Sequence, residues 1–291
     1  MGWRMGECNL LTHIIHNKLA LLGLIFLVIL TLLAIFFPLL SSSDPTLFDP
    51  LLVGDPLPPS WAHPFGTDDL GRDILVRMIY GARVSLMVGV ISVTISIIIG
   101  MMVGLIAGFF SGWVGRGLMI LVDFFLSIPW LFLILIIQVI FTPSIYNVMV
   151  VIGLTSWMGL SRMVRAEVLK VKEETFITAA RSRGIPQHII LFKHILPHTL
   201  NPVIVALMLG MGAAILVESA LSFLGLGVQP PNASWGNMLE NALAYMRDAP
   251  WMALIPGLFI TLTVLSLNFI GDALRSALNA KERDSRFLVS K

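Results

Sequence analysis

The chain has 291 residues, of which 57% are apolar and only 12% are charged, and its formal net charge is +2. Soluble domains are roughly half apolar and about a quarter charged, so this composition excludes a water-soluble globular protein and indicates a membrane protein. The basic residues are spread among apolar segments, which argues against nucleic acid as a partner, and the single cysteine, Cys8, offers neither a disulfide nor a metal site.

Six apolar segments approach the length of about 20 residues that a helix needs to cross a bilayer. They are residues 19–40, 84–110, 118–141, 145–160, 202–222 and 251–270. The first is too long for the apolar part of a secretory signal, so we expect it to be retained as a span. The fourth is short, and we expect its helix to continue through Arg162 and Arg165. The sequence therefore predicts an all-α polytopic membrane protein with six transmembrane helices.

The basic residues predict how these spans are oriented. An even number of spans puts both termini on one side of the membrane. With the termini inside, only four of the 19 basic residues lie outside, and they are Arg72, Arg77, Arg83 and Arg247. Because basic residues favour the cytoplasmic side, we expect both termini in the cytoplasm, an exterior loop over 41–83 and a cytoplasmic loop over 161–198.

The second and third spans carry residues that affect helix packing. Gly100, Gly104, Gly108 and then Gly112 recur every four residues, which would place them on one helical face and allow another backbone to approach closely. Pro129 removes a backbone hydrogen bond inside the third span and predicts a kink there.

Residues 63–75, just before the second span, read HPFGTDDLGRDIL. Thr67 or Asp68 is suited to cap a helix, and the apolar side chains that follow would form one stripe along it. The stripe consists of Ile74, Leu75, Met78 and Ile79. We therefore predict a helix that lies at the membrane surface before the chain enters the second span.

The cytoplasmic loop over 161–198 is too long and too patterned for a simple connection. Glu173 and Glu174 precede a short helix on which Phe176 and Ala180 would share one face. An exposed helix with an aromatic side chain beside small residues suits a groove on another protein. The alternative is a solvated, positively charged loop that lies on the lipid headgroups.

The second half of this loop carries the signals of a helix end followed by a new helix. Gly184 fits the C-terminal cap of the first short helix, and Pro186 fits the first turn of a second one that runs to about Lys193. We therefore expect two short helices outside the bilayer.

Residues 218–236 read ESALSFLGLGVQPPNASWG. Glycines and paired prolines cannot sustain a helix, because glycine is too flexible and proline has no N–H to donate. We expect the chain to leave the fifth span here and to fold back over the exterior mouth of the protein.

Four polar residues lie inside or at the ends of the spans, and they are Asp123, Gln138, Glu218 and Asn268. They are candidates for contact with cargo, with hydrogen bonding between helices as the alternative. The chain has no Gly-Lys-Ser or Gly-Lys-Thr sequence, so it has no P-loop with which to bind ATP. It also lacks the sequence motifs of intramembrane enzymes, and we expect a non-catalytic chain.

The cytoplasmic loop resembles a known signature. Residues 179–184, AARSRG, are followed after nine residues by HILP. The spacing is similar to that of the loop in permease subunits of ATP-binding-cassette (ABC) importers, which has Glu-Ala-Ala, three residues, Gly, nine residues and Ile-x-Leu-Pro. Thr178 stands where that signature has Glu, and His194 stands where it has Ile.

Three further segments resemble the C-type permeases of dipeptide, oligopeptide and nickel importers. They are residues 65–86, 218–236 and 268–275. With the loop, the resemblance extends over nearly the whole chain. It implies the type I ABC importer permease fold, in which a cytoplasmic coupling helix docks on the ATPase.

The resemblance also implies two groups of site residues. Coupling to the ATPase is expected from Glu174, Thr175, Phe176, Thr178, Ala179, Ala180, Gly184 and Pro197. The exterior receptor and gate region is expected to include Asp68, Gly71, Arg72, Asp73, Gly225, Gly227, Pro230 and Trp235. The four polar residues of the spans stay the candidates for the translocation path, and no metal site is expected.

The partners implied are a second, homologous permease, two ATPase subunits that bind ATP and Mg, and an exterior solute-binding protein, all at a prokaryotic inner membrane. The chain itself would hold no cofactor. Residues 1–83 would form the first span and exterior loop with the surface helix, 84–275 the permease core and 276–291 a cytoplasmic tail. Peptides are the expected cargo. A permease for nickel or another small solute is one alternative, and an ion-coupled secondary transporter is another.

Overall fold

The computed structural model describes residues 16–40, 43–110, 112–141 and 144–289. Its elements in chain order are α2 (Lys18–Leu40), α3 (Ile74–Phe109), α4 (Trp113–Ser127), α5 (Trp130–Ile140), α6 (Ile145–Lys172), α7 (Thr175–Ser182), α8 (Gln187–Ile189), the π-helix η1 (Ile190–Ile195), α9 (Leu196–Phe223), α10 (Trp235–Ala242), the 3₁₀-helix η2 (Leu243–Tyr245) and α11 (Trp251–Val289). Within these ranges the regular structure is helical apart from one bridge between Thr67 and Asp73.

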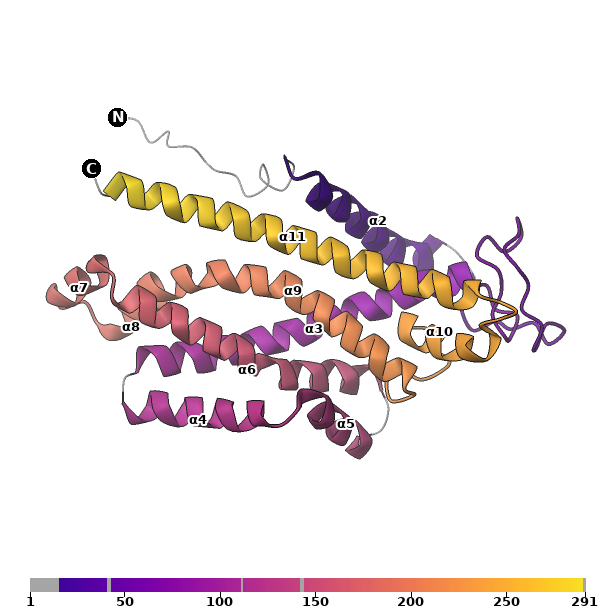
Figure 1. Ribbon diagram of the computed structural model, residues 1–291, viewed down its shortest axis with the longest axis horizontal. Helices are drawn as coiled ribbons and strands as arrows, with labels where there is room; N and C mark the ends of the chain where they lie inside the picture. Colours follow the sequence, from indigo (N-terminus) through magenta and orange to yellow (C-terminus); the bar gives the residue numbers. More distant parts are fainter. Residues whose placement is uncertain (1–15, 41–42, 111, 142–143, 290–291) are drawn as a thin grey trace.

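The long helices form an elongated bundle (Figure 1). α3, α6, α9 and α11 run along its long axis, α2 packs beside α11, and α4 packs beside α6. α10 and the loop over 43–73 lie at one end, whereas α7 and α8 lie at the other. α2 runs toward the α10 end, and α11 runs back to the α7 end.

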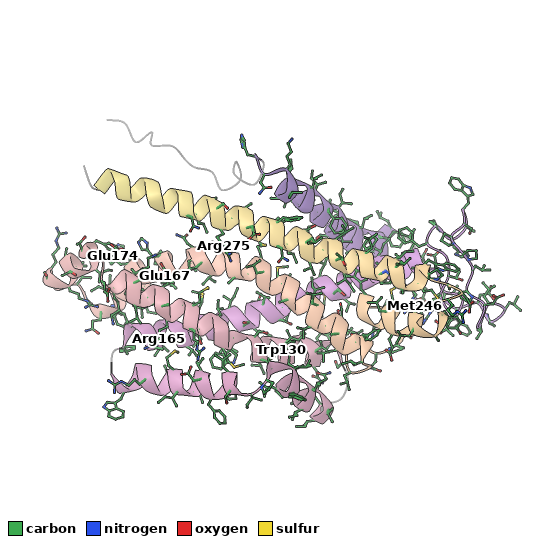
Figure 2. The ribbon with its side chains drawn as sticks, viewed as in Figure 1. Trp130, Arg165, Glu167, Glu174, Met246 and Arg275 are labelled. Carbon is green, nitrogen blue, oxygen red and sulfur yellow. The ribbon has the colours of Figure 1, made fainter. Side chains whose placement is uncertain are left out.

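Several of these helices have the length and composition of membrane spans. Five qualify, namely α2, α3, α6, the helix formed by α8, η1 and α9, and α11. The bent pair of α4 and α5 brings the number in the described ranges to six when it is counted as one broken span, which confirms the predicted architecture. Many large apolar side chains stay exposed on α2, α4 and α5 (Figure 2), as expected of surfaces that face lipid.

The third span is broken at Pro129 and not merely kinked. α4 ends at Ser127, Pro129 immediately precedes α5, and the two helices are bent by 83°. Proline has no N–H to donate and pushes the residue before it away from helical geometry, and Ile128 is indeed extended. The Pro129 carbonyl then accepts the N–H groups of Phe132 and Leu133, which starts α5.

The prediction of a separate surface helix before the second span is wrong. α3 begins at Ile74 and continues without a break to Phe109. Its first turn is capped by Asp73, whose carboxylate accepts the N–H of Val76 at 3.1 Å, and not by the two residues expected for this role. No proline interrupts the sequence between the apolar stripe and the span, so the two segments form one helix.

α3 and α6 pack closely along a line of glycines. A Cβ atom added at Gly104 would lie 2.6 Å from Cβ of Val164, and one added at Gly108 would lie 2.7 Å from Cβ of Val168. Only glycine allows this separation, so the predicted close approach is confirmed for the first three glycines of the series. The fourth, Gly112, is outside the face. It precedes α4 with a φ of +92°, a conformation that favours glycine.

The loop between the fourth and fifth spans differs in part from expectation. The extension of the fourth span is confirmed, because α6 continues to Lys172. The second short helix is wrong as a separate element, since α8, η1 and α9 form one helix from Gln187 to Phe223. Pro197 lies at the start of α9, and the wider π-helical turn before it lets the helix continue where proline would clash with the carbonyl four residues back.

Candidate functional site

α7 is a short helix that two apolar side chains anchor to the end of the bundle. Ile177 has no exposed surface and Ala180 is 7% exposed. Both belong to one apolar cluster with Val171 of α6 and with Ile190 and Ile195 of η1. Burial of an isoleucine side chain stabilises by about 1.5 to 3 kcal/mol. The position of α7 therefore follows that of α6 and of the helix that begins with α8.

The other side of α7 is exposed. It presents Glu174, Thr175, Thr178 and Ala179, and Figure 2 shows Glu174 at this end of the bundle. Phe176 is 40% exposed, and its ring centroid lies 5.4 Å from that of His198. Phe176 and Ala180 are four residues apart on α7, so they lie on one face of this helix as predicted. Ala180 is buried beside Ile177, whereas Phe176 lies at the exposed edge of that face.

Gly184 ends α7 as predicted. Its φ is +72°, and the N–H groups of Gly184 and Ile185 donate to the carbonyls of Arg181 and Ala180 at 2.9 and 3.2 Å. A Cβ atom at Gly184 would meet nothing within 4 Å, so the backbone conformation and not crowding favours glycine. Pro197 lies outside α7, in the first turn of α9.

Asp68, Gly71, Arg72 and Asp73 form one compact turn before α3. One carboxylate oxygen of Asp68 accepts the backbone N–H of Arg72 at 2.9 Å. The other accepts Nε of Arg72 at 2.7 Å and lies 3.3 Å from Nε of Arg77. The three side chains are at most 7% exposed, so two guanidinium groups share one buried carboxylate. Asp69, whose carboxylate lies 3.8 Å from Arg72, supplies a second negative charge beside these two cations. Removing the shared carboxylate would leave two buried cations short of a partner.

Neighbouring residues fix this turn in place. Gly71 has a φ of +73°, and a Cβ atom there would lie 2.9 Å from Cβ of Leu52. Asp73, besides capping α3, lies 2.8 Å from Nδ1 of His63. Burial, together with the charge of the neighbouring carboxylate, raises the pKa of Asp69. The turn before α3 is therefore dense in charge and tightly packed.

After α9 the chain folds back against α3 and α9, as predicted for residues 218–236. Trp235 has no exposed surface, and its Nε1 donates to the carbonyl of Met78 in α3 at 3.1 Å. A Cβ atom at Gly236 would lie 2.6 Å from the carbonyl oxygen of Ser219, so only glycine fits. The predicted residues of this segment are Gly225, Gly227, Pro230 and Trp235. We call residues 43–73 and 224–250 together the end cap.

Glu218 lies beneath the end cap and has no exposed surface. Its carboxylate accepts the hydroxyl of Ser85 in α3 at 3.2 Å and that of Ser222 in α9 at 2.8 Å. The Ser222 oxygen also accepts the N–H of Val228 in the end cap at 3.0 Å. Glu218 therefore joins two spans to the end cap, which matches the alternative of hydrogen bonding between helices.

The other three polar candidates contact separate partners. Asp123 of α4 forms an exposed ion pair with Arg162 of α6. Gln138 of α5 donates to the carbonyl of Leu226 in the end cap at 2.8 Å. Asn268 of α11 faces α9. The structure thus does not bring the four candidates together around one cavity.

A groove of about 370 Å³ lies between α3, α6 and α9, and none of the four polar candidates lines it. Its walls are apolar or small side chains together with the hydroxyls of Ser92, Ser96 and Ser156. Ser92 donates to the carbonyl of Met149 at 2.9 Å, and Ser156 donates to that of Ile152 at 2.7 Å. The sequence reasoning missed these serines. The available signal was the spacing of Ser92 and Ser96, four apart on one helical face.

Two family models match the chain. Residues 100–284 match the family described as binding-protein-dependent transport system inner membrane component, which is more than half of the chain. Residues 11–59 match the N-terminal TM domain of oligopeptide transport permease C. The two matches follow each other in the order of the predicted first span and permease core.

Curated relatives cover most of the chain. DppC, a dipeptide transport system permease protein of Alkalihalophilus pseudofirmus, is 45% identical over 91% of this chain and 86% of its own length. OppC, an oligopeptide transport system permease protein, is 38% identical in Bacillus subtilis and 42% identical in Escherichia coli. Each of these two matches covers 92% of this chain, and 87% and 89% of the relative's own length.

The fold is also similar to that of a solved structure. The match is the MetNI methionine ABC transporter in inward-facing conformations, with a TM-score of 0.57 over 70% of this chain and 97% of that chain. The sequence identity is 19%, so this likeness concerns the fold, and it confirms the predicted importer permease architecture. From the family models and the relatives, this chain belongs to the family of binding-protein-dependent transport system inner membrane components.

Proposed function

We propose that this chain forms one half of the translocation pathway of an ABC importer for peptides, paired with a second, homologous permease and driven by two ATPase subunits. The observation that carries the proposal is α7, which is anchored through Ile177 and Ala180 and presents a polar face and Phe176 outward. A short helix presented in this way suits a groove on a partner. The names of the dipeptide and oligopeptide relatives favour peptides over nickel as cargo.

α7 would pass motion of the ATPases to the spans through its apolar anchor. Because Ile177 and Ala180 pack against α6 and against the start of the α8–α9 helix, a displacement of α7 moves both helices. ATP and Mg would be bound by the ATPase subunits, since this sequence has no P-loop. By linkage, a cargo-loaded receptor at the opposite end should raise ATP turnover.

This assignment orients the chain in the membrane. The α7 end faces the cytoplasm, where ATP is available, and the positive-inside rule favours the same orientation. Both termini are then cytoplasmic. The end cap faces the exterior of a prokaryotic inner membrane, where a solute-binding protein would dock and release its cargo.

The groove between α3, α6 and α9 would line this chain's share of the pathway. The hydroxyls of Ser92, Ser96 and Ser156 offer hydrogen bonds to peptide groups, and no charged side chain is among the described residues that line it. A lining of this kind has no charge that would prefer cargo side chains of one sign over those of the other. Selection among peptides is then left to the exterior binding protein.

The direct test is whether ATPase subunits co-purify with this chain when Phe176 is replaced by Asp. We expect wild type to retain the ATPases and Phe176→Asp to lose most of them, because a charge would enter the apolar part of the contact. Trp61→Asp is the matched control. It also changes an exposed aromatic side chain, fully exposed in this case, but in the loop at the opposite end.

Retention of the ATPases by Trp61→Asp and their loss from Phe176→Asp would support α7 as the coupling helix. Equal retention by both variants would overturn that role. If no ATP-hydrolysing chain co-purifies with wild type, the importer proposal itself fails.

A further inference from the structure

A second pocket, of about 500 Å³, lies at the α7 end of the bundle. The end of α3, the end of α6, α7 and the start of α8 surround it. Its described lining includes Phe109, Phe110, Lys172, Arg181, Gln187 and Ile190, and no acidic residue is among the lining residues described. The pocket is separate from the groove between α3, α6 and α9, with which it shares no lining residue.

Two cations from different helices face this pocket. Lys172 is held in position, because its Nζ donates to the carbonyls of Gly108 and Phe109 at 3.2 and 2.8 Å and lies 5.8 Å from the centroid of the Phe109 ring. Arg181 comes from α7 and lies close enough for its charge to act on Lys172. Two like charges held this close repel each other, and an anion between them would remove the repulsion.

The other side of the pocket is apolar and aromatic. The rings of Phe109 and Phe110 meet edge to face with centroids 5.3 Å apart, and Phe110 is 46% exposed. These two residues end the apolar length of α3, and Trp113, which is 88% exposed, begins α4 close by in the sequence. Aromatic residues at the ends of spans mark the level of the lipid headgroups.

We propose that this pocket binds the phosphate of an anionic phospholipid of the cytoplasmic leaflet, between Lys172 and Arg181, with the start of an acyl chain against Phe110. The apolar wall beside the cations distinguishes a lipid from free phosphate, and basic pockets between transmembrane helices on the cytoplasmic side are typical lipid sites. The orientation rests on the proposed function above. The lipid would hold one side of α7 to the membrane surface. The exposed face of α7 would stay available to the ATPase.

The test is native mass spectrometry of the chain purified with its co-purifying partners and mixed with dioctanoyl phosphatidylglycerol. We expect wild type to retain this lipid and to retain phosphatidylcholine of the same chain length much less. Arg181→Gln should weaken phosphatidylglycerol binding about fivefold, the effect of one basic residue near an anionic surface. Arg183→Gln is the matched control. It removes an exposed arginine two residues away that does not line the pocket, and retention should match wild type.

Lys172→Gln gives a second, independent reading and should also weaken binding about fivefold. Lys172 holds the end of α3, so the thermal stability of the Lys172→Gln variant is measured as well. If this variant unfolds, the result for Arg181→Gln decides the test.

Several outcomes would overturn the proposal. Equal loss of the lipid from Arg181→Gln and Arg183→Gln would leave only a general surface attraction. Full displacement of the lipid by inorganic phosphate would assign the pocket to a soluble anion. Detachment of the ATPases from Arg181→Gln with unchanged lipid retention would assign Arg181 to a protein contact. If wild type binds the lipid as expected but carries no ATPase, the proposed function fails while the lipid site stands.

Discussion

The two ends of the bundle are held by different kinds of contact. The end cap packs through apolar side chains such as Met238, and it adds buried charges and hydrogen bonds. These are the Asp68 carboxylate shared by Arg72 and Arg77 and the indole of Trp235 on α3. α7 at the opposite end rests on the apolar side chains of Ile177 and Ala180. Directional polar contacts fix the end cap in one geometry. The small apolar contact under α7 holds this helix in place and leaves its exposed face free for another contact.

The difference suits the two tasks proposed for these ends. A surface that receives a loaded binding protein gains from being formed in advance, because less ordering is then required on binding. A helix that passes motion from an ATPase needs to stay attached to the spans and to present its outer face. The comparison predicts that mutations will affect global stability at the end cap and coupling at α7.

The largest effect is expected from Asp68→Ala. It leaves the guanidinium groups of Arg72 and Arg77 buried without their shared carboxylate, which costs about 3 to 5 kcal/mol of unfolding free energy. Asp55→Ala in the same loop is the control, because Asp55 is exposed. Thermal unfolding of the purified complex measures both. Equal losses would mean that the buried network does not hold the end cap.

Ile177→Ala should cost about 2 to 4 kcal/mol, but locally, because the anchor of α7 is separate from the contacts of the end cap. The expected signs are faster protease cleavage within residues 173–186 and loss of receptor-stimulated ATP turnover. The global unfolding temperature should change little. Ile189→Ala, at a position 37% exposed, serves as control. A global loss as large as that of Asp68→Ala would contradict the comparison.

Ser222→Ala tests the joint between spans and end cap. It deprives one Glu218 oxygen and the N–H of Val228 of their buried partner, which costs about 1 to 3 kcal/mol. Ser276→Ala, which removes an exposed hydroxyl bonded within its own helix, should be close to neutral. Thermal unfolding separates the two variants. Equal melting temperatures would mean that the contact between Glu218 and Ser222 does not stabilise the attachment of the end cap to the spans.

Asp69→Asn should have the smallest effect and the opposite sign. Burial and the charge of Asp68 raise the pKa of Asp69 more than the ion pair with Arg72 lowers it. The folded protein therefore binds this proton more readily than the unfolded chain does. At neutral pH the ionised group therefore lowers stability, and the amide should raise the unfolding temperature slightly. The advantage should shrink as the pH falls through the raised pKa. An unchanged difference between pH 7 and pH 4 would contradict this account.

The sequence predicts most of what depends on local signals. The number of spans, the first three glycines of the series on α3 and the capping glycine of α7 each follow from neighbouring residues, and the structure confirms them. The same reasoning fails where two local signals compete. Gly112 continues the spacing of its series but also fits a turn, and Pro129 predicts a kink where the structure has a complete break.

The rest depends on contacts between distant segments. Nothing near Phe176 indicates that Ile177 is the side chain that packs, because its partners Ile190 and Ile195 come from the next helix. The groove is hidden for the same reason, since Ser92 and Ser156 are ordinary residues until α3 and α6 are placed side by side. The pocket with Lys172 and Arg181 likewise exists only in the folded chain.

α3 connects the two ends directly. Its 36 residues have a rise of about 54 Å, with no proline inside, and each end is held by a charged side chain, Asp73 at the first turn and Lys172 at the last carbonyls. A rod of this kind resists bending and tilts as a whole. Any rotation of α3 that widens the spacing of helices at one surface of the membrane would therefore narrow it at the other, which is the reciprocal movement that alternating access requires.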